Sequence, residues 1–184
     1  MLVPCPVDHV DKFPYAVSIV LQHEGKFTDD KTDPGGTTNY GISLRYLKDI
    51  NLDIDGDGDV DSDDIRKLSE VEAKGIYKKF WWDRYHYSRI NDTTLATKIF
   101  DLSVNVGAKQ SHKLVQKAVN AIQNEHIGVD GKMGNYTIKA INNAPPEKLL
   151  NSIRFEAESF YLDLINQRPQ LAKYKNGWLR RAAW

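Results

Sequence analysis

Cysteine is almost absent from this chain of 184 residues, which contains only Cys5. A single cysteine cannot form an intramolecular disulfide bond, so the fold must be stable without one. A chain of this length can bury most of its apolar surface in one domain, or in one domain with a small appended half. Such a cross-link is therefore not needed.

Net charge is also absent, because 25 Lys and Arg residues balance 25 Asp and Glu residues. Without a basic excess there is no electrostatic reason to expect nucleic acid as the partner. The charges are unevenly spread, however: acids concentrate in 53–64 and much of the base lies in 109–184. This distribution fits either a C-terminal half that contacts an anionic polymer or a mixed, solvated surface.

Long hydrophobic runs are missing as well. The first ten residues lack the basic start and sustained apolar stretch of a secretory signal. No segment has the length of a membrane span. We therefore expect a protein without a membrane span that is made in the cytoplasm without a Sec signal.

Helical periodicity dominates what is present. Phe13, Val17, Val20 and Leu21 fall on one face of a helix over 13–24, and Gly25 suits its end. The patterns predict further helices over 43–51, from Asp63 or Asp64 through Lys79, within 95–106 and 114–122, over 136–142 after an Asn135 cap, and from Pro146 to about 167. Period-two alternation is scarce, so the sequence predicts a mainly α fold with a small β-hairpin or extended region around 26–42.

Segment 53–64 has the spacing of a twelve-residue EF-hand calcium loop. Carboxylates occupy loop positions 1, 3, 5, 9 and 12, Gly58 occupies position 6, and Asp59 at position 7 would offer its backbone carbonyl. The predicted ligands are Asp53, Asp55, Asp57, Asp59, Asp61 and Asp64. Asp64 replaces the usual Glu, and its shorter side chain would weaken Ca²⁺ binding or tolerate Mg²⁺. We expect a structural ion at a junction of two helices; a solvated acidic turn is the alternative.

Glu24 lies in the last turn of the first predicted helix. The negative end of the helix dipole disfavours the ionised form of a carboxyl group at this position. A carboxyl group that keeps its proton near neutral pH can protonate a glycosidic oxygen. A glutamate at a helix end is ordinary by itself, so its surroundings decide the interpretation.

The residues after Glu24 resemble the signature of glycoside hydrolase family 108, the muramidases of phage endolysins and bacterial wall enzymes. The similarity runs through Glu24-Gly25 and Asp33-Pro34-Gly35-Gly36-Thr37-Thr38-Asn39-Tyr40-Gly41-Ile42, with Lys26 where a second Gly is common. Later blocks around 80–85, 100–107 and 177–181 also resemble the family, and segment 129–137 is similar to a turn of peptidoglycan-binding domains. The resemblance implies a lysozyme-like helical fold. It further implies a catalytic region over 1–107 and a peptidoglycan-binding-like half over 108–184, either separate or sharing one compact domain.

The resemblance also implies roles for individual residues. Glu24 would be the general acid that cleaves the β-1,4 bond between N-acetylmuramic acid and N-acetylglucosamine. By the looser analogy to phage lysozymes, Asp33 or Thr38 would place the attacking water, although Asp33 could equally cap its turn. The residues expected to bind substrate are Asn39, Tyr40 and Trp82, whereas Trp81 is expected to be mostly core.

The expected partners are the glycan strands of peptidoglycan, with a monomeric protein and no nucleic acid. An endolysin without a Sec signal would be made in the cytoplasm of a phage-infected host and would act on periplasmic peptidoglycan. Two other functions remain open: a lytic transglycosylase, and a non-catalytic protein that binds the wall or assists secretion.

Overall fold

The computed structural model describes residues 11–25, 27, 37–124 and 126–184. This part of the chain is mainly helical, as predicted, with one two-stranded sheet. The elements are α1 (Phe13–Glu24), β1 (Thr38–Asn39), β2 (Ile42–Ser43), α2 (Leu44–Asp49), α3 (Ser62–Lys67), α4 (Glu70–Tyr77), the π-helix η1 (Lys78–Asp83), the 3-10 helix η2 (Tyr87–Arg89), α5 (Thr93–Val106), α6 (Ala108–Ile122), α7 (Asn135–Asn143), α8 (Pro146–Gln167), the 3-10 helix η3 (Pro169–Tyr174) and α9 (Lys175–Ala183).

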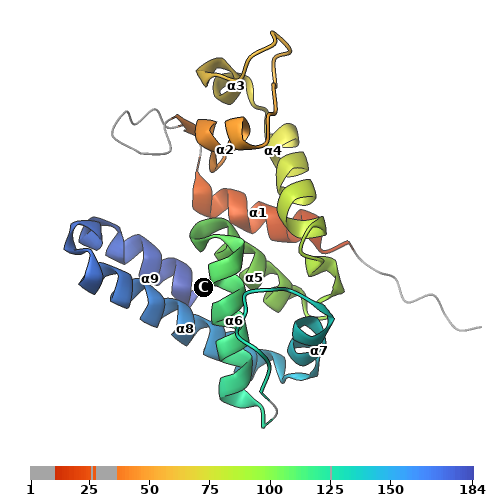
Figure 1. The fold of residues 1–184 in the computed structure, drawn as a ribbon, viewed down its shortest axis with the longest axis vertical. Helices are drawn as coiled ribbons and strands as arrows, with labels where there is room; N and C mark the ends of the chain where they lie inside the picture. Colours follow the sequence, from red (N-terminus) through yellow and green to blue (C-terminus); the bar gives the residue numbers. More distant parts are fainter. Residues whose placement is uncertain (1–10, 26, 28–36, 125) are drawn as a thin grey trace, which may run out of the picture.

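Helix α5 lies at the centre of the molecule (Figure 1). Every residue from Leu95 to Ser103 is buried, which is the pattern of a helix that is covered on all sides. Helix α5 packs against α1, α6 and α8, and α9 folds back on α8. Buried side chains from Val17 in α1 to Ala182 in α9 belong to one hydrophobic cluster, so the core is continuous from the first helix to the last.

The hairpin sits beyond the C-terminal end of α1. Thr38 pairs with Ser43 and Asn39 with Ile42, which leaves Tyr40 and Gly41 as a two-residue turn. Both turn residues have positive φ, 51° and 77°, as in a type I′ turn, whose twist matches that of the strands. The Ser43 hydroxyl then accepts from Tyr46 N and starts α2. The hairpin predicted for 26–42 is therefore located at 38–43.

Two details of the helix predictions are wrong. The single helix expected from 63 to 79 is divided at Leu68, and Ser69 starts α4 with a capping box that includes Glu72. Asn135 is not a cap: it is the first residue of α7, and its side-chain oxygen accepts from Arg89. Among the described residues, no helix is both long and apolar enough to cross a membrane.

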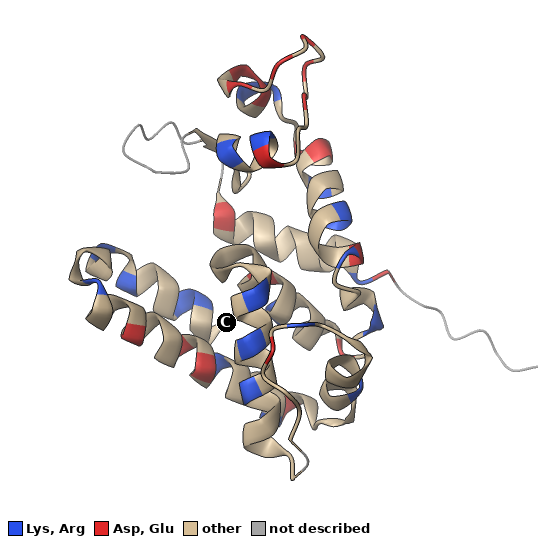
Figure 2. Ribbon diagram, viewed as in Figure 1, with Lys and Arg blue, Asp and Glu red and all other residues tan. Residues whose placement is uncertain are grey.

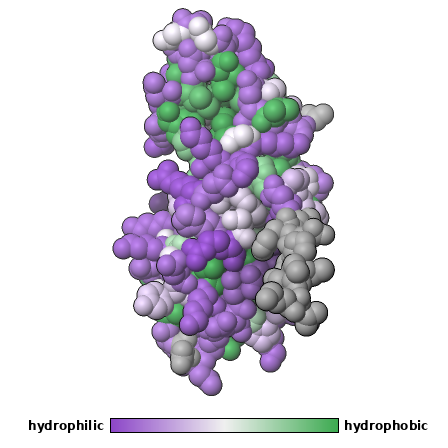
Figure 3. All heavy atoms as spheres, turned by 90° about the vertical axis from the view of Figure 1, so that its right-hand side faces the viewer, coloured by the Kyte–Doolittle hydropathy of each residue, from purple (hydrophilic) through white to green (hydrophobic). Residues whose placement is uncertain are grey.

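Apolar surface is visible near the upper end of the molecule (Figure 3). A groove of about 300 Å³ in this region lies between segment 52–54 and the helices α4 and η1. Its apolar lining consists of Leu52, Ile54, Ile76 and Phe80.

Candidate functional site

Glu24 is the last residue of α1. Gly25 ends the helix with a φ of 77°, and its N–H donates to Leu21 O. The Glu24 side chain is 18% exposed, yet its Oε1 atom is buried. The carboxyl group therefore presents one oxygen to the protein interior, and its exposed surface lies elsewhere on the side chain.

The buried oxygen of Glu24 faces Arg181, which belongs to the last helix. Arg181 Nη2 lies 2.7 Å from Glu24 Oε1 and 2.8 Å from Asp101 Oδ1. Arg181 also donates from Nε to Asp101 Oδ2 and from Nη2 to the backbone oxygen of Asp101. The contact with Glu24 is an ion pair without the alignment of a hydrogen bond. One guanidinium thus lies between two carboxylates from different helices.

Asp101 has a second partner in His23. The His23 Nδ1 atom lies 2.9 Å from Asp101 Oδ1, and it must donate because a carboxylate can only accept. Burial acts to raise the pKa of Asp101, but the His23 hydrogen bond and the charge of Arg181 outweigh it and hold the pKa below its usual range. His23 therefore binds Asp101 in α5, while its chain neighbour Glu24 pairs with Arg181.

The C-terminal end of α9 is fixed by two further cations. The buried Lys98 donates to Arg181 O and Ala182 O, and Arg154 donates to Trp184 O. Burial lowers the pKa of Lys98 to about 8. These contacts hold the helix end, as cations near a helix C-terminus commonly do. Arg181, Lys98 and Arg154 were all missed from the sequence, although the block containing Arg181 resembled the family.

The hairpin turn covers the other side of Glu24. A Cβ added at Gly41 would lie 2.5 Å from Glu24 Cγ, so glycine is needed for this close approach. The Tyr77 hydroxyl donates to Tyr40 O at 2.9 Å and holds the turn in place. Tyr40 is half-buried and remains a candidate for substrate contact, and Thr38 is half-buried in β1. Asp33 lies outside the described residues.

Two predicted substrate-binding residues are corrected by the structure. Trp82 is 1% exposed, and its ring packs against Phe13, Tyr87 and Phe100 in the core. Trp81, expected in the core, is the more exposed of the pair. The π-helix η1 adds a residue to its turn and so changes which of the two faces inward.

Asn39 is the second correction. Its side chain is buried and donates to the backbone oxygens of Ile65 and Leu68 at 3.0 and 3.2 Å. Both acceptors lie at the end of α3. Asn39 therefore ties the hairpin to α3 and is not available to a glycan strand.

A pocket of about 510 Å³ adjoins this site. It lies where the end of α1, residue Asn105 of α5 and helix α9 meet. The lining residues are Gln22, His23, Asn105, Gly177, Trp178, Arg180, Arg181 and Trp184. Two members of the ion network, His23 and Arg181, thus reach a concave surface large enough for a sugar unit.

The acidic loop lies at the upper end of the molecule, where Asp residues gather (Figure 2). Oxygens of Asp53, Asp55 and Asp57 lie within 4.8 Å of one another, as do those of Asp59, Asp61 and Asp64. The charge of Asp57 raises the pKa of Asp59, which reflects crowding of like charges. Asp53 Oδ1 and Oδ2 accept from Gly56 N and Gly58 N, which folds the first half of the loop back on itself.

Asp64 has a different role in the loop. It is buried, its Oδ1 accepts from Ile54 N, and its Oδ2 accepts from Asp61 N. Burial acts to raise the pKa of Asp64, but these backbone hydrogen bonds prevail and lower it. Lys67 pairs with Asp55. Both groups of three Asp residues therefore fit a hard cation by donor type and proximity, and Asp64 also joins the two ends of the loop.

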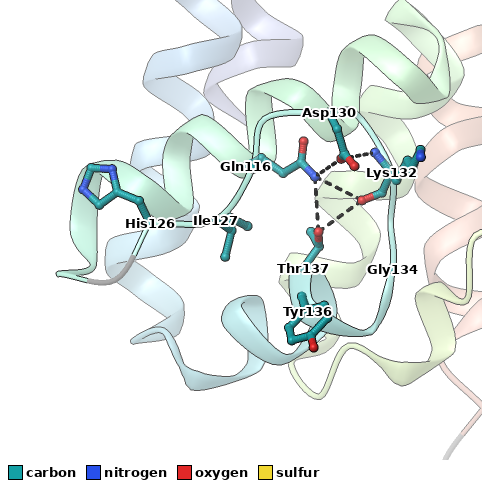
Figure 4. Close-up of a pocket in the computed structure, with 9 residues that line it drawn as sticks. Gln116, His126, Ile127, Asp130, Lys132, Gly134, Tyr136 and Thr137 are labelled. Carbon is teal, nitrogen blue, oxygen red and sulfur yellow. Dashed lines mark hydrogen bonds between the residues drawn. The ribbon is translucent and has the colours of Figure 1, made fainter.

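A second groove lies in the C-terminal half (Figure 4). It has a volume of about 400 Å³ and runs beside segment 126–137. Gln116 Nε2 donates to Asp130 Oδ1, Lys132 O and Thr137 Oγ1, and its Oε1 accepts from Gly131 N. These bonds give the turn a structural role, because they connect it to α6 and α7. Tyr136, at the groove, is 86% exposed.

Family comparisons match both halves of the chain. Residues 17–107 match the family described as "Glycosyl hydrolase 108", and residues 110–183 match "Predicted Peptidoglycan domain". The two matched regions meet between α5 and α6, so the chain joins a region of a glycosyl hydrolase family to a peptidoglycan domain. Residues 17–107 belong to the glycosyl hydrolase 108 family.

One solved structure shares the fold over nearly the whole chain. It is described as "Structure of Brucella abortus SagA". Its sequence is 22% identical, the match covers 93% of this chain and 89% of that chain, and the TM-score is 0.74. A search of the curated proteins found no match.

Proposed function

We propose that the protein is a lysozyme-type peptidoglycan hydrolase that cleaves the β-1,4 bond between N-acetylmuramic acid and N-acetylglucosamine. Family membership supports a glycoside hydrolase acting on peptidoglycan. The observation that carries the finer assignment is Glu24: a partly exposed carboxyl group at a helix end, with one buried oxygen against an arginine.

In this mechanism the protonated form of Glu24 donates its proton to the glycosidic oxygen as the bond breaks, and the ion pair with Arg181 belongs to the ionised form. A negative charge then develops on the carboxyl group, 2.7 Å from the Arg181 guanidinium. A fixed cation at the point where charge develops stabilises the transition state. Asp33 or Thr38 remains the proposed residue for placing water, and Tyr40 the proposed glycan contact at the hairpin.

The substitution Glu24→Gln tests the assignment. The amide keeps the shape of the side chain but cannot donate the proton, so turnover of purified peptidoglycan should fall about 10²–10⁴-fold. Binding to sedimented peptidoglycan should stay within about twofold, because uniform binding does not depend on the proton. Turnover at the wild-type rate would show that Glu24 is not the acid.

Mass spectrometry of the products separates this proposal from the alternatives. A hydrolase adds water across the bond, whereas a lytic transglycosylase closes an anhydro ring and leaves a product lighter by one water. Binding with no product from the wild-type protein would support a non-catalytic wall-binding role.

We further propose that the acidic loop holds a structural Ca²⁺ ion, with Mg²⁺ as a weaker substitute. Asp53, Asp55 and Asp57 would provide carboxylate ligands, supported by their proximity, and the crowded charges around Asp59 favour a cation nearby. The ion would fix the chain between α2 and α3.

The cellular setting follows as part of the same proposal. An endolysin role would have the protein made as a monomer in the cytoplasm of a phage-infected cell and active on periplasmic peptidoglycan. Light scattering of the purified protein tests the monomer. Cells that produce the protein in the cytoplasm should lyse only after their inner membrane is permeabilised. This result would test the route by which the protein reaches peptidoglycan.

A further inference from the structure

We propose that Arg181 is a positioning residue for Glu24 in the cleavage reaction, so that the peptidoglycan-domain half completes the catalytic centre. This inference rests on the proposed role of Glu24 as the acid. Arg181 lies within the region that matches the peptidoglycan domain, and Glu24 lies within the glycosyl hydrolase region. Their 2.7 Å ion pair therefore crosses the boundary between the two matched regions.

The aligned hydrogen bonds of Arg181 go to Asp101 and not to Glu24. Asp101 alone accepts hydrogen bonds from Nε and Nη2 of Arg181, through both carboxylate oxygens and its backbone oxygen. Glu24 Oε1, by contrast, is buried and has no aligned hydrogen bond in the described part of the chain. The guanidinium is thus the charged group that faces this oxygen, and Asp101 holds the guanidinium in place.

Stability alone does not account for such a cluster. Burying charged groups is unfavourable before they pair, and replacing a buried ion pair with apolar residues is often neutral or stabilising. Here Arg181 and Asp101 are 9% and 1% exposed. Lys98 and Arg154 add further contacts to the helix end that carries Arg181. The burial of Arg181 and Asp101 is therefore better explained by their positioning of the Glu24 carboxyl group than by a gain in stability.

The geometry determines which oxygen of Glu24 can carry the transferable proton. Arg181 has donors only, so the atom it approaches must offer a lone pair. A proton on Oε1 would point into the guanidinium, whereas a proton on the other oxygen, Oε2, avoids this clash. Because Oε1 is buried, a glycan would have to take the proton from Oε2. Arg181 thereby orients the acid and stabilises the carboxylate formed after proton transfer.

Other charged or titratable groups also surround Glu24. Asp101 comes from α5, Tyr77 from α4, Tyr161 from α8, and His23 is its neighbour on α1. Among these described groups, Arg181 is the one in direct ionic contact with Glu24. Removing its charge should therefore act on Glu24 more strongly than changing any of the others.

The test compares Arg181→Met and Arg181→Lys with wild type, using purified peptidoglycan as substrate. Arg181→Met should lower kcat about 10–100-fold with KM within about twofold, because a misplaced catalytic group costs on this order. The alkaline limb of its pH–activity profile should move upward, since the carboxylate loses its cation. Arg181→Lys keeps the charge but cannot bridge two carboxylates in the same way, so kcat should fall less and the alkaline limb should move less.

Arg154→Met is the matched control, because Arg154 holds the end of the same helix without contacting Glu24. A purely structural contribution of Arg181 predicts equal effects of the two Met variants on kcat and no movement of the alkaline limb. If Arg181→Met fails to fold because it leaves the buried Asp101 with His23 alone, the double variant Asp101→Asn with Arg181→Met removes both charges. A folded double variant with wild-type kcat and an unmoved alkaline limb overturns the inference.

Failure of the inference is distinguishable from failure of the proposed function. Loss of turnover in Glu24→Gln together with an unaffected Arg181→Met would leave Glu24 as the acid and dismiss the positioning role. Full turnover in Glu24→Gln would dismiss the acid itself, and the positioning role with it.

Discussion

At the residue scale, two glycines beside Glu24 share a positive φ but not an environment. Gly25 and Gly41 both have a φ of 77°. A Cβ at Gly25 would meet no described heavy atom within 4 Å, whereas one at Gly41 would meet Glu24 and the Tyr77 hydroxyl below 3 Å. The pair therefore separates backbone strain from steric contact with Glu24.

Substituting each glycine by alanine tests this difference. Gly25→Ala should cost on the order of 1–3 kcal/mol from strain alone. Gly41→Ala should cost more and should also lower turnover, because the hairpin must move away from Glu24. Urea unfolding and peptidoglycan turnover measure the two effects. Unchanged turnover in Gly41→Ala would contradict the close approach of the hairpin to Glu24.

The surroundings of Glu24 could be predicted from the sequence only in part. The apolar spacing in α1 and the glycine after it correctly predicted a helix that places Glu24 at its end. The approach of Arg181 to Glu24 could not be predicted, because no local pattern links residues in the first and last helices. Asn39 lies within the motif that carried the resemblance, yet the motif could not show that its side chain points toward α3.

At the element scale, η1 and the acidic loop show how local geometry departs from a regular pattern. Trp81 and Trp82 are adjacent in sequence, and helical spacing alone does not fix which one is buried when a π-turn intervenes. The acidic loop has EF-hand spacing, but Asp64 at its last position binds backbone N–H groups. The sequence therefore predicted where the aromatic segment and the acidic loop lie. The role of each side chain depends on how these segments pack in the structure.

Calcium binding by the loop is testable by thermal unfolding. Adding Ca²⁺ to chelator-treated protein should raise Tm, because an ion that binds only the folded state stabilises it by about 2.7 kcal/mol at a hundredfold excess over Kd. Asp53→Ala should abolish this rise, whereas Asp83→Ala on η1 should keep it, since Asp83 pairs with Lys78 outside the loop. No rise in the wild-type protein, with no heat in calorimetry, would leave only a solvated acidic turn.

At the scale of the whole molecule, buried titratable groups join distant helices. Asp101 joins α1, α5 and α9 through His23 and Arg181. His112 of α6 donates from Nδ1 to Gly131 O, which leaves Nε2 to accept from the Tyr87 hydroxyl in η2. Burial lowers the pKa of His112, against the opposing effect of the Gly131 hydrogen bond. Both groups therefore bind protons less readily in the folded state than in the unfolded state.

Acid should consequently destabilise the fold. The unfolded chain takes up protons first at His112, below about pH 6.5, and then at Asp101, below about pH 4, so stability falls as the pH decreases through each range. Asp101→Asn should be less stable at pH 7 and should lose the part of the decline below about pH 4. Urea unfolding between pH 7 and pH 3 measures both. An unfolding free energy that stays constant for the wild-type protein would contradict the linkage.

The pairing of the first and last helices also has a consequence for when the protein becomes active. A chain leaves the ribosome from its N-terminus, so Glu24 is made long before Arg181. If Arg181 orients Glu24, a partly synthesised chain contains Glu24 without the cation that positions its carboxyl group. Cleavage of peptidoglycan would then begin only after α9 has been synthesised and has packed against the rest of the fold.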